Sequence, residues 1–484
     1  MIFNKKRLTK ICIFCLLVTI LSASCISART KYLRLPVSVY KDKMIAGWIG
    51  QMAGVAQGAP TEGKYCDIII PANEMPNWSP KLINDAFWQD DLYVEMTFLR
   101  TMEQHGLDVS IRQAGIDFAN SLYGLACANY AGRKNLRKGI APPDSGHPKF
   151  NNCPNDIDYQ IEADYSGLIA PGIPNLPIQL GDKFGRLMNY GDGVYAGQFI
   201  GGMYSAAFFE KDIRKVIQAG LKCIPAKSQY AEMVRDMLKW SQENTDWEKT
   251  WQLCEEKYRK NPEYQKASNG MIDCKINGAY VLMGLLYGDG DPDKTIRIAT
   301  RAGLDSDCNP SSAAGVLFTM IGYTKIPDEY KSDLEKNSVF YSTAYSFNAL
   351  TDVCEKLAEE AVVRAGGKIE TDKNGEKIFI IPIQAPKPNK LLLSWAPEPA
   401  ENSKYSEAEF AQITVTQIPE ALKKAVAVFA PGWEISQCGP DMNPGMHEME
   451  RGRQNIMLTH PFDSETPCIL KKSVDIPANK TTTL

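Results

Sequence analysis

The stretch Asp305-Ser306-Asp307-Cys308-Asn309 stands directly before an apolar segment, and a shorter stretch, Gln89-Asp90-Asp91, stands at the start of another, much earlier in the chain. Both read as helix starts, because acidic residues in a first turn favour the helix dipole and Pro310 suits a helix N-terminus. Hard divalent cations such as Mg²⁺ take several oxygen ligands. Four carboxylates at two helix starts therefore predict one metal site.

Helix capping alone can explain either stretch taken singly, so the metal interpretation needs further support. Phe87 and Trp88 precede the first stretch and small apolar residues, Ala313 to Phe318, follow the second. Carboxylates in such apolar surroundings need a compensating cation. A third acid, Glu62, closes a Gly-rich loop after a Gly- and Ala-rich helix, where it could reach a ligand.

The fold class follows from the period of the apolar residues. They recur at helical spacing in several segments: Ile45, Trp48, Ile49 and Met52; Leu92, Met96 and Leu99; Val281, Leu282 and Leu285. Small residues are frequent inside these segments and allow helices to approach closely. Residues 36–366 are therefore predicted to form a compact all-α domain.

The pattern changes after Gly366-Gly367, which is typical of a helix C-cap. Lys368 to Thr371 and Lys377 to Ile380 flank Asn374-Gly375, a strong hairpin signal. Four later runs are predicted as strands: Ile413-Thr414-Val415, Ala425 to Phe429, Asn455 to Leu458, and Ile469-Leu470. Residues 367–484 are thus expected to form a smaller β-sandwich-like module. A further strand beginning at Lys480 has nothing after it, which leaves a truncated module as one interpretation.

The first 28 residues are typical of a secretory signal peptide. Lys5, Lys6 and Arg7 precede an apolar run from Ile11 to Leu21 that is too short to span a bilayer. Two alternatives remain open: secretion past Ala28, or lipidation of Cys25, which would be the only membrane contact. We expect export, to the periplasm, the outer membrane as a lipoprotein, or the exterior. Export permits disulfides, and Cys438 with Cys468 is the pair we expect.

Composition excludes several function classes. The 54 Lys and Arg residues nearly balance the 57 Asp and Glu residues, so nucleic-acid binding is not expected. Four histidines argue against a Ser-His-Asp mechanism. No Gly-x-Gly-x-x-Gly or Gly-x-x-x-x-Gly-Lys loop is present, which argues against a dehydrogenase or NTPase.

Three blocks in order make the chain, from about Asp42 to Gly322, resemble the ADP-ribosylglycohydrolase family, which includes ADP-ribosyl-acceptor hydrolases and dinitrogenase reductase-activating glycohydrolases. Gly54 to Glu62 is similar to the family's Gly-Asp-Ala-x-Gly-x-Pro-x-Glu block. Gln89-Asp90-Asp91 is similar to its Thr-Asp-Asp block, and Gly303 to Asn309 to its Gly-Gly-Asp-x-Asp-Thr-Asn block.

The resemblance implies an all-α fold, two Mg²⁺ ions with Mn²⁺ as an alternative, and cleavage of the bond between the anomeric carbon of ADP-ribose and its acceptor. By matching positions, the metal ligands are Gln89, Asp90, Asp91, Asp305 and Asp307, and the catalytic acid or base is Glu62. The substrate would be a small-molecule or protein-linked sugar.

Three departures from the family pattern support a second hypothesis. Gln89 and Cys308 replace threonines, and Val55 replaces an acid. An amide oxygen can still bind a hard cation, whereas a neutral thiol is a poor ligand for Mg²⁺. A catalytically reduced protein that binds a sugar or nucleotide sugar is therefore the alternative. Asp164 and Asp192, in Gly-rich segments, could line the same cleft.

Overall fold

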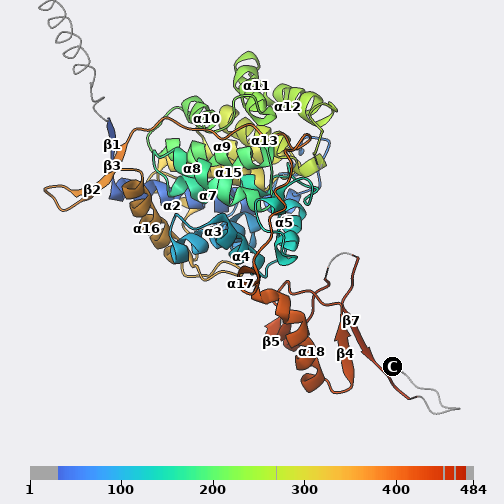
Figure 1. Cartoon of the computed structure of the whole chain (residues 1–484). Helices are drawn as coiled ribbons and strands as arrows, with labels where there is room; N and C mark the ends of the chain where they lie inside the picture. Colours follow the sequence, from blue (N-terminus) through green and yellow to red (C-terminus); the bar gives the residue numbers. More distant parts are fainter. Residues whose placement is uncertain (1–30, 269, 451–452, 463–464, 476–484) are drawn as a thin grey trace, which may run out of the picture.

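The computed structural model describes residues 31–268, 270–450, 453–462 and 465–475. A helical body holds most of them, and a smaller C-terminal module projects from one end of that body (Figure 1). The expected signal peptide, the lipidation site at Cys25 and the strand at Lys480 lie outside the described residues.

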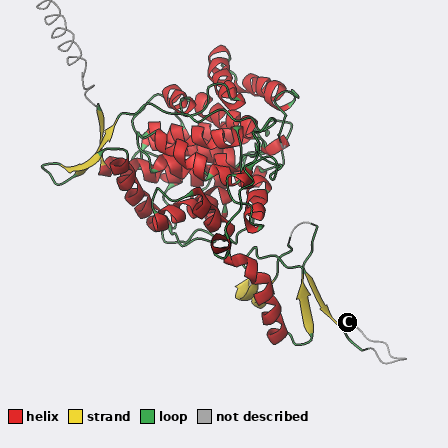
Figure 2. Cartoon of the chain, in the orientation of Figure 1, coloured by secondary structure: helices red, strands yellow, loops and turns green. Residues whose placement is uncertain are grey.

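Helices dominate the described chain (Figure 2). The α-helices of the body are α2 (Val37–Gly58), α3 (Asp90–His105), α4 (Ile111–Ala119), α5 (Cys127–Arg137), α6 (Asp158–Ile161), α7 (Asp164–Leu168), α8 (Asn175–Lys183), α9 (Asp192–Ala207), α10 (Ile213–Leu221), α11 (Gln229–Glu243), α12 (Trp247–Cys254), α13 (Cys274–Tyr287), α14 (Pro292–Arg301), α15 (Cys308–Ile321) and α16 (Phe347–Arg364). Short helical turns are η1 (Ala59–Thr61), η2 (Pro80–Trp88), η3 (Asp144–Gly146), η4 (Gly185–Leu187), η5 (Glu255–Arg259), η6 (Gly270–Ile272) and η7 (Asp328–Tyr330). The predicted all-α fold class of this region is confirmed.

Helices α2 and α15 pack antiparallel with their backbones in contact. A stripe of α2 glycines faces α15, and a Cβ atom at Gly50, Gly54 or Gly58 would lie 2.4, 2.3 or 2.0 Å from the carbonyl oxygens of Ala314, Pro310 and Ser306 respectively. Real Cβ atoms do not approach so closely, so only glycine permits this separation. The contact brings the end of α2 beside the start of α15.

A three-stranded antiparallel sheet closes one end of the body. Its strand order is β1 (Tyr32–Pro36), β3 (Lys377–Pro382), β2 (Lys368–Thr371). Phe379 of the central strand β3 lies opposite Leu35 of β1 and opposite Ile369 of β2. The hairpin predicted at Asn374-Gly375 is confirmed. Leu35 and Phe379 are buried in the core of the helical body, so this hairpin packs on the body. The domain boundary expected after Gly367 stays a prediction.

The C-terminal module contains α17 (Glu407–Phe410), η8 (Thr414–Gln417), α18 (Ile418–Phe429), β4 (Trp433–Ser436), β5 (Gly445–Glu450), β6 (Arg453–Leu458) and β7 (Ile469–Lys472). A small β-containing module after the helical domain is therefore confirmed. Its described strands pair as two two-stranded sheets, β4 with β7 and β5 with β6.

Two of the strands expected in this module are wrong. Ala425 to Phe429 lies in α18, because Leu422 and Val426, four residues apart, are buried together on one helix face. An apolar run alone does not distinguish a strand from a helix. Ile413 to Val415 forms no strand, since Ile413 and Val415 are buried against the helical body and η8 begins between them.

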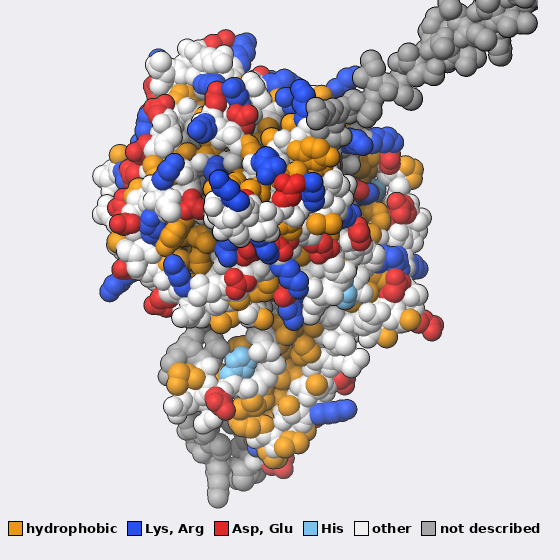
Figure 3. All heavy atoms as spheres, turned by 90° about the vertical axis from the view of Figure 1, so that its left-hand side faces the viewer, with side chains coloured by type: hydrophobic (Ala, Val, Ile, Leu, Met, Phe, Trp, Pro, Cys, Tyr) orange, Lys and Arg blue, Asp and Glu red, His pale blue; other side chains and the backbone are white. Residues whose placement is uncertain are grey.

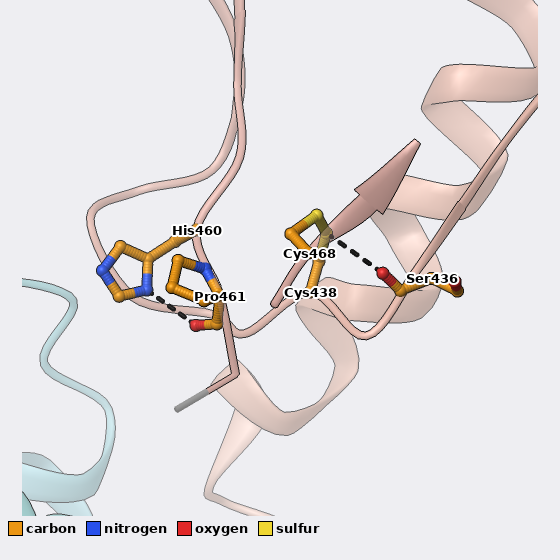
Figure 4. Close-up of a disulfide and its surroundings, with 5 residues drawn as sticks. All are labelled: Ser436, Cys438, His460, Pro461 and Cys468. Carbon is orange, nitrogen blue, oxygen red and sulfur yellow. Dashed lines mark hydrogen bonds between the residues drawn. A yellow bond between two sulfur atoms is a disulfide. The ribbon is translucent and has the colours of Figure 1, made fainter. Parts of the chain in front are cut away.

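A disulfide and an ion pair fix this module. Cys438 bonds to Cys468, the pair expected from the sequence, with His460 and Pro461 close by (Figure 4). The Asp441 carboxylate accepts a hydrogen bond from Arg137 of α5 at 2.8 Å. It also forms an ion pair at 3.0 Å with Arg133, whose side chain is only 1% exposed. The body and the module are therefore joined by a buried charge network as well as by the chain.

Charges of both signs are interspersed over the body face drawn in Figure 3. In the part of the chain that is described, no helix has the length and apolar character needed to cross a bilayer.

We predict that Gly54→Ala lowers the free energy of unfolding by about 1–3 kcal/mol, the range typical of overpacked cores. The new Cβ would lie 2.3 Å from the Pro310 carbonyl and would push α15 away. Chemical denaturation measures this change. Val39→Ala, at a 40% exposed position of the same helix, is the control and should change stability by less than about 0.5 kcal/mol. Equal stability of Gly54→Ala and the native chain would contradict the close packing.

Candidate metal centre

Three chain segments bring the predicted site residues together. Glu62 follows α2 by one short turn, η1. Asp90 and Asp91 form the first turn of α3, and Asp305 and Asp307 lie just before α15. Because Gly58 contacts the Ser306 backbone, the end of α2 and the start of α15 must meet.

Hydrogen bonds between two loops hold the acidic segment in place. The Gly63 amide donates to the Leu304 carbonyl at 3.1 Å, and the Leu304 amide donates to the Tyr65 carbonyl at 3.0 Å. The Thr61 and Ser306 hydroxyls lie 2.9 Å apart. Leu304 has a φ of +59°, a conformation that non-glycine residues rarely adopt and that surrounding structure must maintain. The loop that carries Asp305 is thus held rigidly.

Two groups of side chains could each hold a cation. Ligand atoms of Glu62, Asp305 and Asp307 lie within 4.8 Å of one another, and so do those of Asp91, Asp307 and Cys308. Asp307 belongs to both groups. It stands at the N-cap of α15 without capping the helix, and its Oδ1 is buried with no hydrogen-bond partner, as is Oδ1 of Asp91. Unpaired buried carboxylate oxygens suit a hard divalent cation, so the donor set fits Mg²⁺.

The site has a buried side and an accessible side. Asp91 is 0% and Asp307 2% exposed, whereas Glu62 is exposed and Asp90 half-buried. A ligand that reaches the centre from solvent would therefore pass Glu62 and Asp90.

Burial and mutual repulsion raise the pKa of each carboxyl group in the centre. Burial, together with the charges of Asp91 and Glu62, raises the pKa of Asp305 to about 7. Burial also raises the pKa of Asp307 and Asp91 well above the usual range, with Asp305 and Asp307 respectively as the largest charged neighbours. Within the described ranges, no lysine, arginine or histidine forms an ion pair with these carboxylates. A bound cation would remove the repulsion.

Cys308 and Gln89 differ in what they contribute. The Cys308 thiol donates to Oδ2 of Asp91 at 3.1 Å, and burial raises its pKa so that it stays neutral. It therefore orients a carboxylate. Gln89 is the N-cap of α3, and its side chain makes no cap hydrogen bond. Asp90 lies outside the two groups, although its charge raises the pKa of Glu62. The ligand roles of Gln89 and Asp90 stay predictions.

Several acids near the centre were missed as site residues by the sequence analysis. Burial, together with the charge of Asp90, raises the pKa of Asp158 to about 7. Glu162 is fully buried, and Asp158, Asp90 and Asp91 all raise its pKa. Asp158 and Glu162 lie in Asp156-Ile157-Asp158-Tyr159-Gln160-Ile161-Glu162, where acids alternate with large apolar or aromatic residues. The criterion of acids in apolar surroundings could have found them.

Asp164 and Asp192, the acids of the two Gly-rich segments, lie in different surroundings. Asp164, at the start of α7, is buried close enough to Asp91 to raise its pKa. Asp192 instead neighbours Lys275, which is fully buried and pairs with Asp273 at 2.9 Å. Asn277, on the same helix as Lys275, accepts from the Asp305 amide at 3.4 Å. The segment that contains Asp192 therefore lies next to α13, the helix that binds the loop of Asp305.

The chain is similar to known proteins over its helical body. The model of the ADP-ribosylglycohydrolase family matches residues 36–367. A solved structure described as an "ADP-ribosylglycohydrolase-related protein complex" is 14% identical, covers 66% of this chain and 97% of its own, and has a TM-score of 0.43, too low to support an argument. A search of curated proteins found no match.

We predict that Mg²⁺ and Mn²⁺ bind the metal-stripped protein and that Asp305→Asn and Asp90→Asn each weaken binding at least about tenfold. Isothermal titration measures this. Asp328→Asn, at a side chain 92% exposed, is the control and should bind as the native chain does. Unchanged affinity in Asp305→Asn would show that the two acidic stretches do not share a site.

The raised carboxyl pKa values predict a pH dependence. Between the ordinary Asp pKa of about 4 and the value of about 7 at Asp305, the metal-free folded chain binds more protons than the unfolded chain. Its stability should therefore fall as pH rises from 5 to 8, whereas metal affinity should rise. Thermal unfolding with and without Mg²⁺ measures both trends. A metal-free midpoint that rises over this range would contradict the assignment, and Asp305→Asn should flatten the curve.

Proposed function

The chain belongs to the ADP-ribosylglycohydrolase family, and from this premise we propose that it is an exported, metal-dependent hydrolase that cleaves a glycosidic bond at the anomeric carbon of ADP-ribose or a related sugar. The observation that carries the proposal is the convergence of Glu62, Asp305 and Asp307 within 4.8 Å at an accessible edge of the helical body.

Each acid has a distinct task in this proposal. Asp91, Asp305 and Asp307 would hold the metal, with Asp90 and Gln89 beside them. Bound Mg²⁺ would supply Lewis-acid and templating chemistry to sugar hydroxyls. Glu62 would hold or move the proton of the attacking water, because desolvation and the charge of Asp90 raise its pKa above the usual value of a carboxyl group. The surrounding carboxylates would stabilise positive charge developing on the sugar ring.

A wall of aromatic rings supports a substrate with a planar or pyranose ring. Trp88 is 68% exposed and lies two residues before Asp90, and its ring centroid lies 5.4 Å from that of Tyr341. The ring centroid of Tyr341 lies 5.5 Å from that of Tyr93. Burial and, after it, the charge of Asp90 raise the pKa of Tyr93. The rings thus run from the surface toward Asp90. We assign them to stacking on the substrate.

Two observations support export. The first residues are typical of a signal peptide, with lipidation of Cys25 as the alternative to simple secretion, and the disulfide of Cys438 and Cys468 suits an oxidising compartment. The substrate would then be a small-molecule or protein-linked sugar outside the cytoplasm.

The C-terminal module would bind carbohydrate or brace the body. Trp433 is 41% and Phe462 47% exposed, which favours stacking on sugars, whereas Trp395 is half-buried. The contact of Asp441 with Arg133 and Arg137 supports the bracing role.

A second candidate is a catalytically reduced protein that binds a sugar or nucleotide sugar. The Cys308 thiol supports it, because this group donates to Asp91 where the family has a hydroxyl ligand. Val55, where the family has an acid, is fully buried. Metal-dependent sugar binding without turnover of any ADP-ribosyl or glycosyl compound would favour this candidate.

The decisive experiment screens ADP-ribosylated peptides and aryl glycosides with the mature protein and Mg²⁺. We predict metal-dependent release of the sugar, and a loss of kcat of roughly 10²–10⁴-fold in Glu62→Gln. Titration should show unchanged Mg²⁺ binding in this variant. Wild-type turnover by Glu62→Gln would remove Glu62 from the chemistry.

We also predict that Trp88→Ala raises KM roughly threefold to tenfold and leaves kcat nearly unchanged, as expected for loss of one stacking contact. Steady-state kinetics on an active compound measures this. Phe429→Ala, which removes a 54% exposed ring of α18, is the matched control. A fall in kcat without a change in KM would contradict a stacking role.

A further inference from the structure

A cleft with a volume of about 580 Å³ lies beside the later turns of α3. Its walls are side chains of that helix between Met96 and Gln104, residues 120–123 after α4, residues 342–345 before α16, and Asn443 of the C-terminal module. Small-molecule sites in proteins are typically clefts of roughly 300–1,000 Å³. The cleft therefore has the size of a ligand site, and none of its described lining residues belongs to the two ligand groups of the metal centre.

The polar side chains of the cleft are mostly hydroxyls and amides. They include the hydroxyls of Thr97, Thr101, Ser121 and Thr343 and the amides of Gln104 and Asn443. Hydroxyl and amide groups can both donate and accept hydrogen bonds. Sugar hydroxyls have the same double capacity, so the lining suits a ligand that carries many hydroxyl groups.

Both charged side chains among the described lining residues are already engaged. Arg100 forms an ion pair with Glu103 at 2.7 Å. The Asp117 carboxylate accepts hydrogen bonds from Thr101 and Gln113, each at 2.9 Å. A neutral ligand therefore fits the cleft better than a charged one.

Two further side chains of the cleft have unused hydrogen-bonding groups. Ser342 and Asn443 are exposed, line the cleft, and form no side-chain hydrogen bond within the described chain. Their φ angles are +55° and +50°, a region that residues other than glycine adopt infrequently. Such backbone conformations cluster where proteins hold ligands. These two residues therefore offer a ligand both free polar groups and fixed positions.

Two contacts hold the C-terminal module at the cleft. The Met442 amide donates a hydrogen bond to the Leu122 carbonyl at 2.5 Å, and the Tyr341 hydroxyl lies 3.9 Å from the Met442 sulfur. Leu122 lines the cleft, and Tyr341 directly precedes the lining residues 342–345. Asn443, the residue after Met442, is thus held in place, and the module forms part of the cleft.

The cleft adjoins the aromatic rings beside the metal centre. Tyr123 lines the cleft, and its ring centroid lies 5.0 Å from that of Tyr93. Tyr93 follows Asp90 by three residues on α3. Thr97, which lines the cleft, follows Asp91 by six residues, about 9 Å along the helix axis. A chain of linked sugars whose first ring lies at the metal centre therefore has its next rings within reach of the cleft.

We propose that the cleft binds the acceptor part of the substrate and that this part is a chain of neutral sugars. The sugar to be released would lie at the metal centre, and the rest of the chain would extend past Tyr93 to Gln104 and Asn443. Water would add across the glycosidic bond, so that the released sugar gains an anomeric hydroxyl and the oxygen of the shortened chain gains a proton. The inference rests on the proposed function, because it names the acceptor of the same reaction.

Isothermal titration of the full mature chain in EDTA tests binding without turnover. The probes are neutral hexasaccharides of glucose, mannose, galactose and xylose, and at least one should bind. Gln104→Trp fills the cleft from an exposed position of α3 and should weaken binding at least about tenfold, more than the loss of a typical single hydrogen bond. The control is Gln242→Trp, exposed and next to last in α11 as Gln104 is in α3, which should bind as the native chain does.

A second variant tests the part of the C-terminal module. Asn443→Gly removes the amide and tolerates the φ of +50°, so it should weaken binding about twofold to tenfold through the loss of one hydrogen bond. Circular dichroism checks folding, and if Gln104→Trp does not fold, Asn443→Gly decides alone. Unchanged affinity in Gln104→Trp, or no binding of any hexasaccharide, would overturn the site. Unchanged affinity in Asn443→Gly would overturn the part of the module in it.

Kinetics with Mg²⁺ separates this proposal from the proposed function. Gln104→Trp should raise KM at least about threefold for the hexasaccharide that binds, and leave KM unchanged for an aryl glycoside of the same terminal sugar. An equal change for both compounds would overturn the acceptor assignment. Binding in the cleft without turnover of either compound would contradict the proposed hydrolysis and the acceptor role, whereas the sugar site itself would stand.

Discussion

The close approach of α2 and α15 is the constraint on which the rest of the structure depends. Gly50, Gly54 and Gly58 let the two backbones touch, and no side chain would fit between them. Because the helices are antiparallel, the end of one must meet the start of the other. Glu62 and Asp307, far apart in the sequence, therefore lie within 4.8 Å. A stripe of glycines thus determines the position of the acidic loop.

Electrostatics then dictates what such a centre must hold. Carboxylates lose hydration when they are buried, and each raises the pKa of the next, as Asp305 does for Asp307. The same cost recurs at Glu95, one helical turn along α3 from Asp91, and at Asp164 of α7. A chain that buries this many acids without basic partners in its described part requires cations, protons or both. Both the stability of the folded chain and its affinity for metal therefore depend on pH.

The sequence predicted those elements whose signals are local. Asp90 begins α3, Asn374-Gly375 turns a hairpin, Gly366 with a φ of +83° ends α16, and Cys438 pairs with Cys468. It failed where an apolar run has no clear period. Ala425 to Phe429 forms a helix because Val426 packs beside Leu422 on Ile435 and Cys438, and that surface exists only in the folded module.

The sequence by itself determined the helical class and the acids available for a centre, because period, capping and turn signals act between residues a few positions apart. Only the tertiary structure decided which acids meet. Asp158, Glu162 and Asp164 come from a segment remote from both acidic stretches, and helix packing alone brings them behind Asp90 and Asp91. The tertiary structure also decided that Asp192 lies beside Lys275 and that the Cys308 thiol donates a hydrogen bond to Asp91. Such pairings depend on contacts between helices, which no local pattern encodes.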